Sequence, residues 1–141
     1  MAPSEHSIQS AYFDWARQHS RARRAYAIPN GGKRNLLAAV RLKKEGVRAG
    51  VLDVCLPVPC GGSAGLYIEF KAARNGLSAD QTAEVDALVR DGYAVAVCWD
   101  TQGAIELTQS YLRGEVAPAC FVLKSAKPSR QRAQSQGQPS A

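Results

Sequence analysis

The pattern of apolar and polar positions divides the first 112 residues into helical and extended segments. Apolar residues recur at helical spacing in four segments, which are Ser4 to about His19, Asn35 to Glu45, Ser78 to Gly92, and Thr101 to Leu112. Alternating or continuous apolar residues predict short strands at 24–28, 51–57, 66–71 and 93–99. The order α-β-α-β-β-α-β-α predicts an α/β fold with a small mixed central sheet flanked by helices.

Helix-start and helix-stop residues support these boundaries. Ser4 and Ser78 are plausible N-caps, and Gly46 follows the second helical segment as a stop signal. In that second helix, Leu36, Leu37 and Val40 share one face, and we expect them to point inward. Apolar residues dominate from Tyr93 to Trp99, which predicts a strand covered on both faces. Trp15 and Trp99 are expected in the core.

The chain of 141 residues is long enough for one domain with its own core. We expect a domain at residues 1–123 and a disordered basic tail at 124–141, because the tail lacks large apolar residues. The four cysteines form no C-x-x-C pair. With no signal peptide evident, this predicts a reducing, cytoplasmic setting. No apolar run approaches the ~20 residues of a membrane helix.

The net charge of +6 conceals an uneven distribution. Residues 17–48 hold ten Lys or Arg and one acid, whereas residues 49–123 hold four basic and nine acidic residues. A phosphodiester-cleaving site can use both blocks, the first to grip phosphates and some of the acids to hold a metal ion. The simpler interpretation of the charge alone is a solvated helix face.

An acid on one predicted strand and an acid-x-lysine triplet on the next carry the clearest chemistry. Side chains alternate along a strand, so Glu69 and Lys71 share one face and Phe70 takes the other. If the two strands pair, Asp53 lies beside Glu69. Two carboxylates and a lysine on one surface can hold a hard divalent cation and orient a nucleophilic water. Taken alone, the triplet favours the simpler interpretation of a surface ion pair.

Short sequence motifs that flank these residues make the pattern more specific. They are Pro29-Asn30-Gly31-Gly32-Lys33-Arg34, Leu42 to Val51, Gly65-Leu66-Tyr67-Ile68-Glu69-Phe70-Lys71, Leu77-Ser78-x-x-Gln81, and Gly92 to Val97. In this order they resemble the small, phage-type, stand-alone members of the VRR-NUC family, within the PD-(D/E)xK nuclease superfamily. The resemblance covers about residues 4–112. One departure is Leu52, where the family usually has a proline. Proline supplies no metal ligand, so the change leaves the metal chemistry intact.

The resemblance implies a restriction-endonuclease-like αβββαβ core and a DNA endonuclease that uses Mg²⁺ or Mn²⁺. It also implies branched DNA, a Holliday junction or a flap, as the substrate in phage-type replication or recombination. A homodimer is expected, because a two-fold dimer suits a symmetric four-way junction. The alternative is a non-catalytic nucleic-acid-binding module with a degenerate nuclease fold. The presence of Asp53, Glu69 and Lys71 together favours the enzyme.

The resemblance also implies roles for individual residues. Asp53, Glu69, Lys71 and Gln81 are expected to be catalytic, and the metal ligands to be Glu5, Asp53, Glu69 and the backbone carbonyl of Phe70. Two of these residues have a second interpretation. Glu5 also fits a carboxylate that stabilises a helix N-terminus, and Gln81 completes the capping-box pattern S-x-x-Q.

DNA contacts are expected from the basic segment and the glycine turn that follows it. The candidates are Arg21, Arg23, Arg24, Asn30, Lys33 and Arg34. The backbone N–H groups of a glycine turn before a helix start suit an anion. An ordinary turn is the simpler alternative, and the match to the family motifs favours DNA contact.

Overall fold

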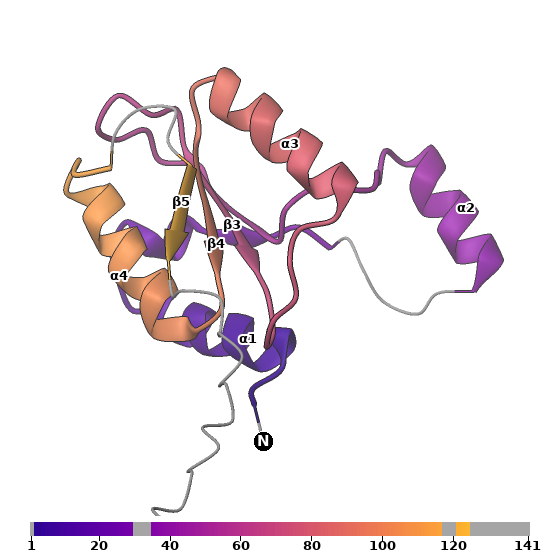
Figure 1. The fold of residues 1–141 in the computed structure, drawn as a ribbon, viewed down its shortest axis with the longest axis horizontal. Coiled ribbons are helices and arrows are strands. Elements are labelled where there is room, and N and C mark those ends of the chain that lie inside the picture. The colour runs from indigo at the N-terminus through magenta and orange to yellow at the C-terminus, as the bar shows by residue number, and fades with distance from the viewer. Residues whose placement is uncertain (1, 30–34, 117–120, 125–141) are drawn as a thin grey trace, which may run out of the picture.

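A computed structural model of the chain describes residues 2–29, 35–116 and 121–124, the last segment as backbone only. Five strands form one sheet in the order β1-β2-β3-β4-β5 (Figure 1). The first three pair antiparallel, and β3, β4 and β5 pair parallel. Their bounds are β1 (Tyr26–Ala27), β2 (Val54–Leu56), β3 (Leu66–Phe70), β4 (Ala94–Cys98) and β5 (Phe121–Lys124). The mixed sheet expected from the sequence is confirmed.

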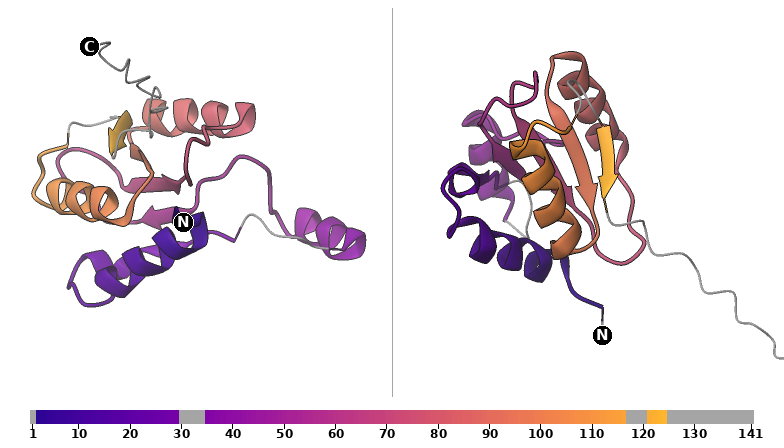
Figure 2. Two further views of the ribbon diagram at one scale, coloured as in Figure 1. Left: turned by 60° about the horizontal axis from the view of Figure 1, so that its bottom comes forward. Right: turned by 90° about the vertical axis from the view of Figure 1, so that its left-hand side faces the viewer.

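Helices lie on both faces of this sheet (Figures 1 and 2). They are α1 (Glu5–Ala16), the short 3-10 helix η1 (Ala22–Arg24), α2 (Leu36–Lys44), α3 (Ala79–Arg90) and α4 (Thr101–Leu112). The helices α1 and α4 pack together on one face, where the hydroxyls of Tyr12 and Thr108 are 2.9 Å apart. The other face is covered by α3.

The alternation of β3 sorts its side chains between these two layers. Leu66, Ile68 and Phe70 are fully buried and belong to the cluster under α1 and α4. Burying each such side chain stabilises the fold by roughly 1.5–3 kcal/mol. Tyr67 faces the other way and packs on the cluster under α3. Glu69, two residues further, therefore emerges on the α3 side.

The register of β2 and β3 fixes the position of Asp53. Val54, the first residue of β2, lies opposite Ile68. Asp53, directly before β2, therefore comes opposite Glu69. The chain after β1 is also attached here, because the backbone N–H of Ile28 donates to the Asp53 carbonyl at 2.7 Å. Three segments that are distant in sequence thus meet beside Asp53.

The inward orientation expected for α2 is wrong. Leu36, Leu37 and Val40 are 79%, 82% and 46% exposed, and α2 contains no buried residue. The helix stands away from the sheet (Figure 1). The segment that follows α2 is attached to α3 by the bidentate ion pair between Arg48 and Glu84. Helical spacing identified the helix and its apolar face but could not show what covers that face.

Two further differences concern the end of the chain and the extent of the first strand. The sequence pattern did not predict β5, and the first strand is two residues long instead of five. Because β5 ends at Lys124, the expected tail boundary at 124 falls inside this strand, and residues 125–141 lie outside the described residues.

Within the described part of the chain, no helix is long and apolar enough to cross a membrane. Trp99 is buried as expected, and Trp15 is partly buried against the core. Cys55 and Cys98 are also buried.

Candidate active site

Asp53 and Glu69 are joined by hydrogen bonds that each carboxylate accepts from the opposite strand. Glu69 Oε2 accepts the backbone N–H of Asp53 at 3.1 Å, and Asp53 Oδ2 accepts the backbone N–H of Phe70 at 2.8 Å. Glu69 is only 3% exposed. The paired strands therefore hold two carboxylates side by side where the sheet meets the start of α3.

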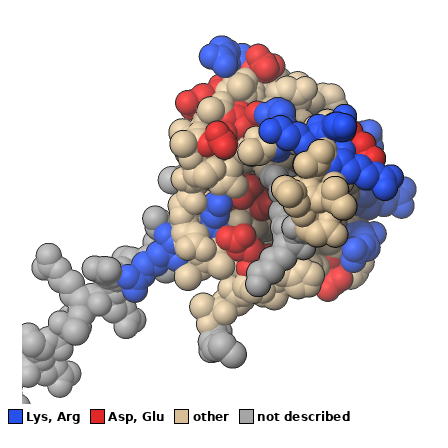
Figure 3. Space-filling view, turned by 90° about the vertical axis from the view of Figure 1, so that its right-hand side faces the viewer, with Lys and Arg blue, Asp and Glu red and all other residues tan. Residues whose placement is uncertain are grey.

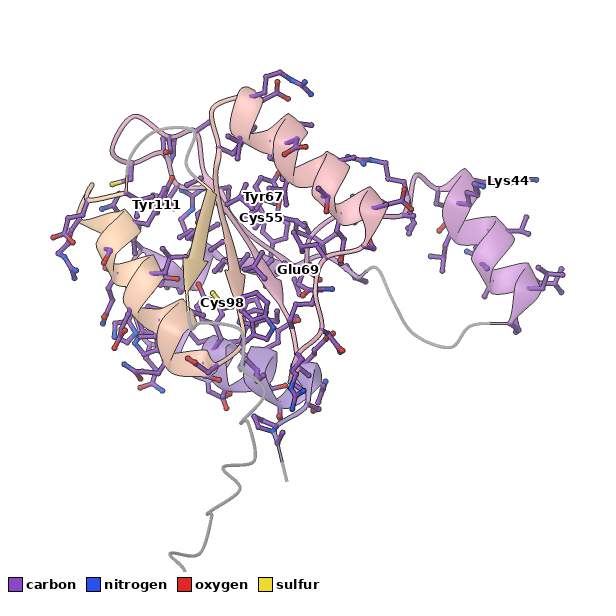
Figure 4. The ribbon with its side chains drawn as sticks, viewed as in Figure 1. Lys44, Cys55, Tyr67, Glu69, Cys98 and Tyr111 are labelled. Atoms are coloured by element: carbon purple, nitrogen blue, oxygen red, sulfur yellow. The ribbon has the colours of Figure 1, made fainter. Side chains whose placement is uncertain are left out.

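Gln81 connects the acidic and basic members of the site. Its amide N–H donates to Glu69 Oε1 at 2.7 Å, and its Oε1 accepts from Lys71 Nζ at 2.9 Å. Lys71 Nζ also lies 3.3 Å from Glu69 Oε1. Figure 4 shows Glu69 beneath the end of α3 that carries this amide. The three side chains form a closed triangle of charge-assisted contacts.

The same glutamine also caps α3. Gln81 Oε1 accepts the backbone N–H of Ser78 at 3.0 Å, and the Ser78 hydroxyl accepts the backbone N–H of Gln81 at 3.1 Å. The two interpretations that the sequence left open for Gln81 are therefore compatible in one conformation. Helix capping fixes the side chain that contacts both Glu69 and Lys71.

A glycine brings the start of α3 close to β2. Gly50 has φ +89, and a Cβ at this position would lie 2.7 Å from the Asp80 carbonyl oxygen. Any other residue would therefore push α3 away from the strand that carries Asp53. In the sequence, Gly50 lies within the motif from Leu42 to Val51. Its position before a predicted strand was the available signal of a close backbone approach.

The electrostatics of the carboxylates are unusual. Burial first, and then repulsion by Asp53, raises the pKa of Glu69 to about 8, although Lys71 opposes the shift. Burial also raises the pKa of Asp53, while the Phe70 N–H lowers it. Carboxyl pairs with shifted pKa values cluster at functional sites. There the unfavourable charge of the pair is compensated by a bound cation, or one carboxyl takes part in proton transfer.

Glu5 reaches the same region from the first turn of α1. Its Oε1 accepts the backbone N–H of Ala72 at 3.3 Å, and its charge contributes to the raised pKa of Asp53. Ser4 caps the helix by accepting the backbone N–H of Ser7. Glu5 is thus both at a helix N-terminus and close to the carboxylate pair. Its role as a ligand stays a prediction.

The donor set can be compared with the needs of different metals. Among the described residues, no three His, Cys, Asp or Glu side chains are grouped as a ready metal site. The paired carboxylates of Asp53 and Glu69 offer oxygen ligands of the kind that bind Mg²⁺, which is usually held by one or two carboxylates and keeps several waters. The carbonyl of Phe70 remains a predicted additional ligand.

The residues predicted to bind DNA are spread over more than one place. Arg21, Arg23 and Arg24 lie in or next to η1, which follows α1 at the end remote from Glu5. Arg21 donates to the Leu112 carbonyl at 3.0 Å, which ties this segment to α4. Asn30, Lys33 and Arg34 lie outside the described residues. On the face in Figure 3, acidic side chains lie in a recess flanked by a cluster of basic side chains.

Comparison with known proteins agrees with this geometry. The family model of the VRR-NUC domain matches residues 1–100. The chain belongs to the VRR-NUC family. Since VRR-NUC is a nuclease-type family, its members are expected to act on DNA and to use a divalent metal.

A solved structure described as a VRR_NUC domain protein shares the fold. Its TM-score is 0.70 at 20% sequence identity, and the match covers 86% of this chain and 95% of that one. No curated protein matches the chain. At this level of identity, the structural likeness supports the VRR-NUC fold and leaves the chemistry to the site residues.

Proposed function

We propose that this VRR-NUC protein is a metal-dependent DNA endonuclease that hydrolyses phosphodiester bonds with Mg²⁺ or Mn²⁺. The single observation that supports the proposal best is the convergence of Asp53, Glu69 and Lys71 at one buried corner. Gln81 links the Glu69 carboxylate to the Lys71 ammonium, and Glu69 accepts the backbone N–H of Asp53.

Each residue has a distinct part in this proposal. Asp53 and Glu69 bind the cation, and Glu5 adds negative charge at the edge of the site. A bound cation supplies charge neutralisation and a water of lowered pKa. Lys71 directs its ammonium toward the attacking water or the negative charge of the transition state. Gln81 holds Lys71 and Glu69 in register, so that neither side chain must be ordered during the reaction.

The alternative is a binding module that has lost catalysis. A module of this kind has no need of a buried pair of carboxylates, which costs free energy unless a partner compensates it. The pair, the lysine and the glutamine are all present, and Glu69, Lys71 and Gln81 contact one another. This combination favours the enzyme.

Branched DNA and a homodimer belong to the same proposal. The described part of the chain carries a surface that a monomer leaves open, namely Leu36, Leu37 and Val40 on α2. Contiguous apolar patches of this kind mark interaction sites. We assign this face to a second copy of the chain, because α3 offers a complementary surface.

That complementary surface is a hollow of about 300 Å³ beside α3. It is lined by Leu77, Thr82, Val85, Asp86, Val89 and Arg90. The apolar lining suits the leucines of α2. The charges also match, because α2 holds three basic residues and α3 holds three acids and one arginine. A reciprocal exchange of these two faces gives a closed two-fold dimer.

The test of the function is a cleavage assay on a panel of labelled DNA structures. Duplex, single-stranded, flap and four-way-junction DNA are each incubated with the protein in Mg²⁺, Mn²⁺ or EDTA. Cleavage that requires the metal and favours the flap or junction supports the proposal. Binding without cleavage of any structure, in either metal, would support the non-catalytic module.

A further inference from the structure

A polar groove runs along α1, away from the residues that form the candidate active site. One part is a hollow of about 390 Å³ on the outer side of α1, lined by His6, Gln9, Ser10, Phe13, Asp14 and Arg17. A second hollow of about 290 Å³ lies between α1 and the η1–β1 segment, lined by Phe13, Ala16, Arg17, Arg23, Ala25 and Ala27. Phe13 and Arg17 line both, so the two hollows are adjacent.

Both walls of this groove lead to the acidic site. On α1, Gln9 lies one helical turn after Glu5, whose carboxylate reaches the backbone of Ala72. On the other wall, Ala27 precedes Ile28, whose backbone N–H donates to the Asp53 carbonyl. A ligand that extends from the groove beyond Gln9 and Ala27 therefore approaches Glu5 and Asp53.

The lining has the chemistry of a polynucleotide site. Arg17 and Arg23 present two guanidinium groups, and the Arg17 guanidinium lies 5.9 Å from the centre of the Phe13 ring. Arg17 is paired only with Asp14, and both side chains are more than two-thirds exposed. An exposed ion pair of this kind is weak, so a phosphate can replace the Asp14 carboxylate as the partner of Arg17. The half-buried Phe13 ring offers a surface for a base or sugar.

We propose that this groove is a track for one DNA strand that leads to or from the cleavage site. Phosphates contact Arg17 and Arg23, and the strand passes over Phe13 and Gln9 before it reaches Glu5 and Asp53. From Glu5 to Arg17, α1 is about 18 Å long, at ~1.5 Å per residue. The track extends the proposed nuclease function, since it explains how a strand emerging from branched DNA is held.

The test measures DNA binding in the full chain with Asp53→Ala, which prevents cleavage. The probes are a labelled duplex with a single-stranded thymidine arm and the same duplex without the arm. Arg17→Ala, Arg23→Ala and Phe13→Leu are each added to this background. Arg113→Ala is the matched control, because Arg113 is also exposed and paired with one carboxylate, on Glu115, but lines neither hollow.

The expected result is a selective loss of affinity for the armed DNA. Arg17→Ala and Arg23→Ala each weaken binding about three- to tenfold and reduce the slope of log affinity against log salt by about 0.7. Phe13→Leu weakens binding about fivefold, the loss that stacking on one aromatic ring predicts. Arg113→Ala leaves affinity and slope unchanged.

Equal affinities and slopes for Arg17→Ala, Arg23→Ala and Arg113→Ala would overturn the track. That result would leave the nuclease proposal standing, because cleavage by the wild-type chain tests it separately. If Phe13→Leu fails to fold, the two arginine variants still decide, since both residues are at the surface. Failure of the Asp53→Ala parent to bind the armed DNA would also overturn the track, whereas cleavage by the wild-type chain decides the nuclease proposal.

Discussion

Lys71 sits within hydrogen-bonding distance of both Gln81 and Glu69, so its charge and its position can be separated by substitution. Lys71→Met keeps an apolar stem of similar length and removes the ammonium. We expect metal and DNA binding to persist while cleavage falls by orders of magnitude, because an electrostatic contact made in the transition state contributes roughly 3–4 kcal/mol. Single-turnover rates at saturating enzyme measure the chemical step without product release. A loss below about tenfold would reduce Lys71 to a structural partner of Glu69.

Glu69 gives the protein a pH-dependent stability whose sign follows from its raised pKa. Its pKa of about 8 in the folded chain exceeds the ordinary value of 4.5. The folded state therefore favours the protonated acid. In EDTA, the free energy of unfolding should fall as pH rises from about 4.5 through about 8.

Denaturant titrations of the wild-type chain and Glu69→Gln across this pH range measure the effect. Glu69→Gln should lack the part of the decline that comes from this carboxyl, at about 1.4 kcal/mol per unit of pKa shift. Added Mg²⁺ or Mn²⁺ should restore stability at the upper end of the range, since a cation compensates the ionised pair. Parallel pH profiles for the two proteins would show that Glu69 titrates normally.

At this scale, the sequence predicted which of these residues lie together better than it predicted the hydrogen bonds between them. Strand alternation placed Glu69 and Lys71 on one face, and strand pairing placed Asp53 beside them. Gln81 had two interpretations because a capping box is a local signal, whereas its contacts to Glu69 and Lys71 depend on how α3 packs on the sheet. Gly50 was overlooked as a contact residue for the same reason, since its neighbour Asp80 is 30 residues away in sequence.

Among the elements, α2 shows most clearly what periodicity can and cannot predict. Helical spacing identified α2 and its stripe of Leu36, Leu37 and Val40, but an apolar stripe fits a core or a partner equally well. Its exposure in the described chain favours the partner. The short strand β5 was missed because a few apolar residues next to a polar tail give too little period-2 signal.

The proposed role of α2 in the dimer can be tested by measuring the molecular mass of the protein in solution. Leu36→Gln and Leu37→Gln keep good helix formers and remove the apolar face. We expect the double variant to sediment as a monomer at concentrations where the wild-type chain is a dimer. Its melting temperature should not fall, beyond what loss of the dimer removes, because neither leucine is buried in the monomer.

Ala83→Gln, on the exposed side of α3 and outside the lining of the hollow, is the control and should leave the mass unchanged. A wild-type chain that remains monomeric at high concentration would remove the dimer from the proposal. So would a double variant with the wild-type mass.

In the whole molecule, the two charge blocks of the sequence acquire a spatial meaning. The basic block 17–48 includes η1 and α2, which lie at different ends of the fold (Figure 1). The acidic block includes Asp53 and Glu69 of the candidate active site. The sequence could predict the fold class because each element carries its own pattern. The arrangement of the charges required the sheet register and the path of β1, which are long-range features.

The most direct test of the central claim compares two isosteric substitutions. Glu69→Gln and Glu84→Gln each remove one carboxylate and keep the shape of the side chain. Glu69 belongs to the candidate active site, whereas Glu84 forms the ion pair with Arg48. The measurement is the single-turnover cleavage rate of junction or flap DNA in Mg²⁺ or Mn²⁺. We predict that Glu69→Gln lowers the rate by at least about a hundredfold, while Glu84→Gln cleaves at nearly the wild-type rate. Cleavage by Glu69→Gln at the wild-type rate would contradict the assignment of this site.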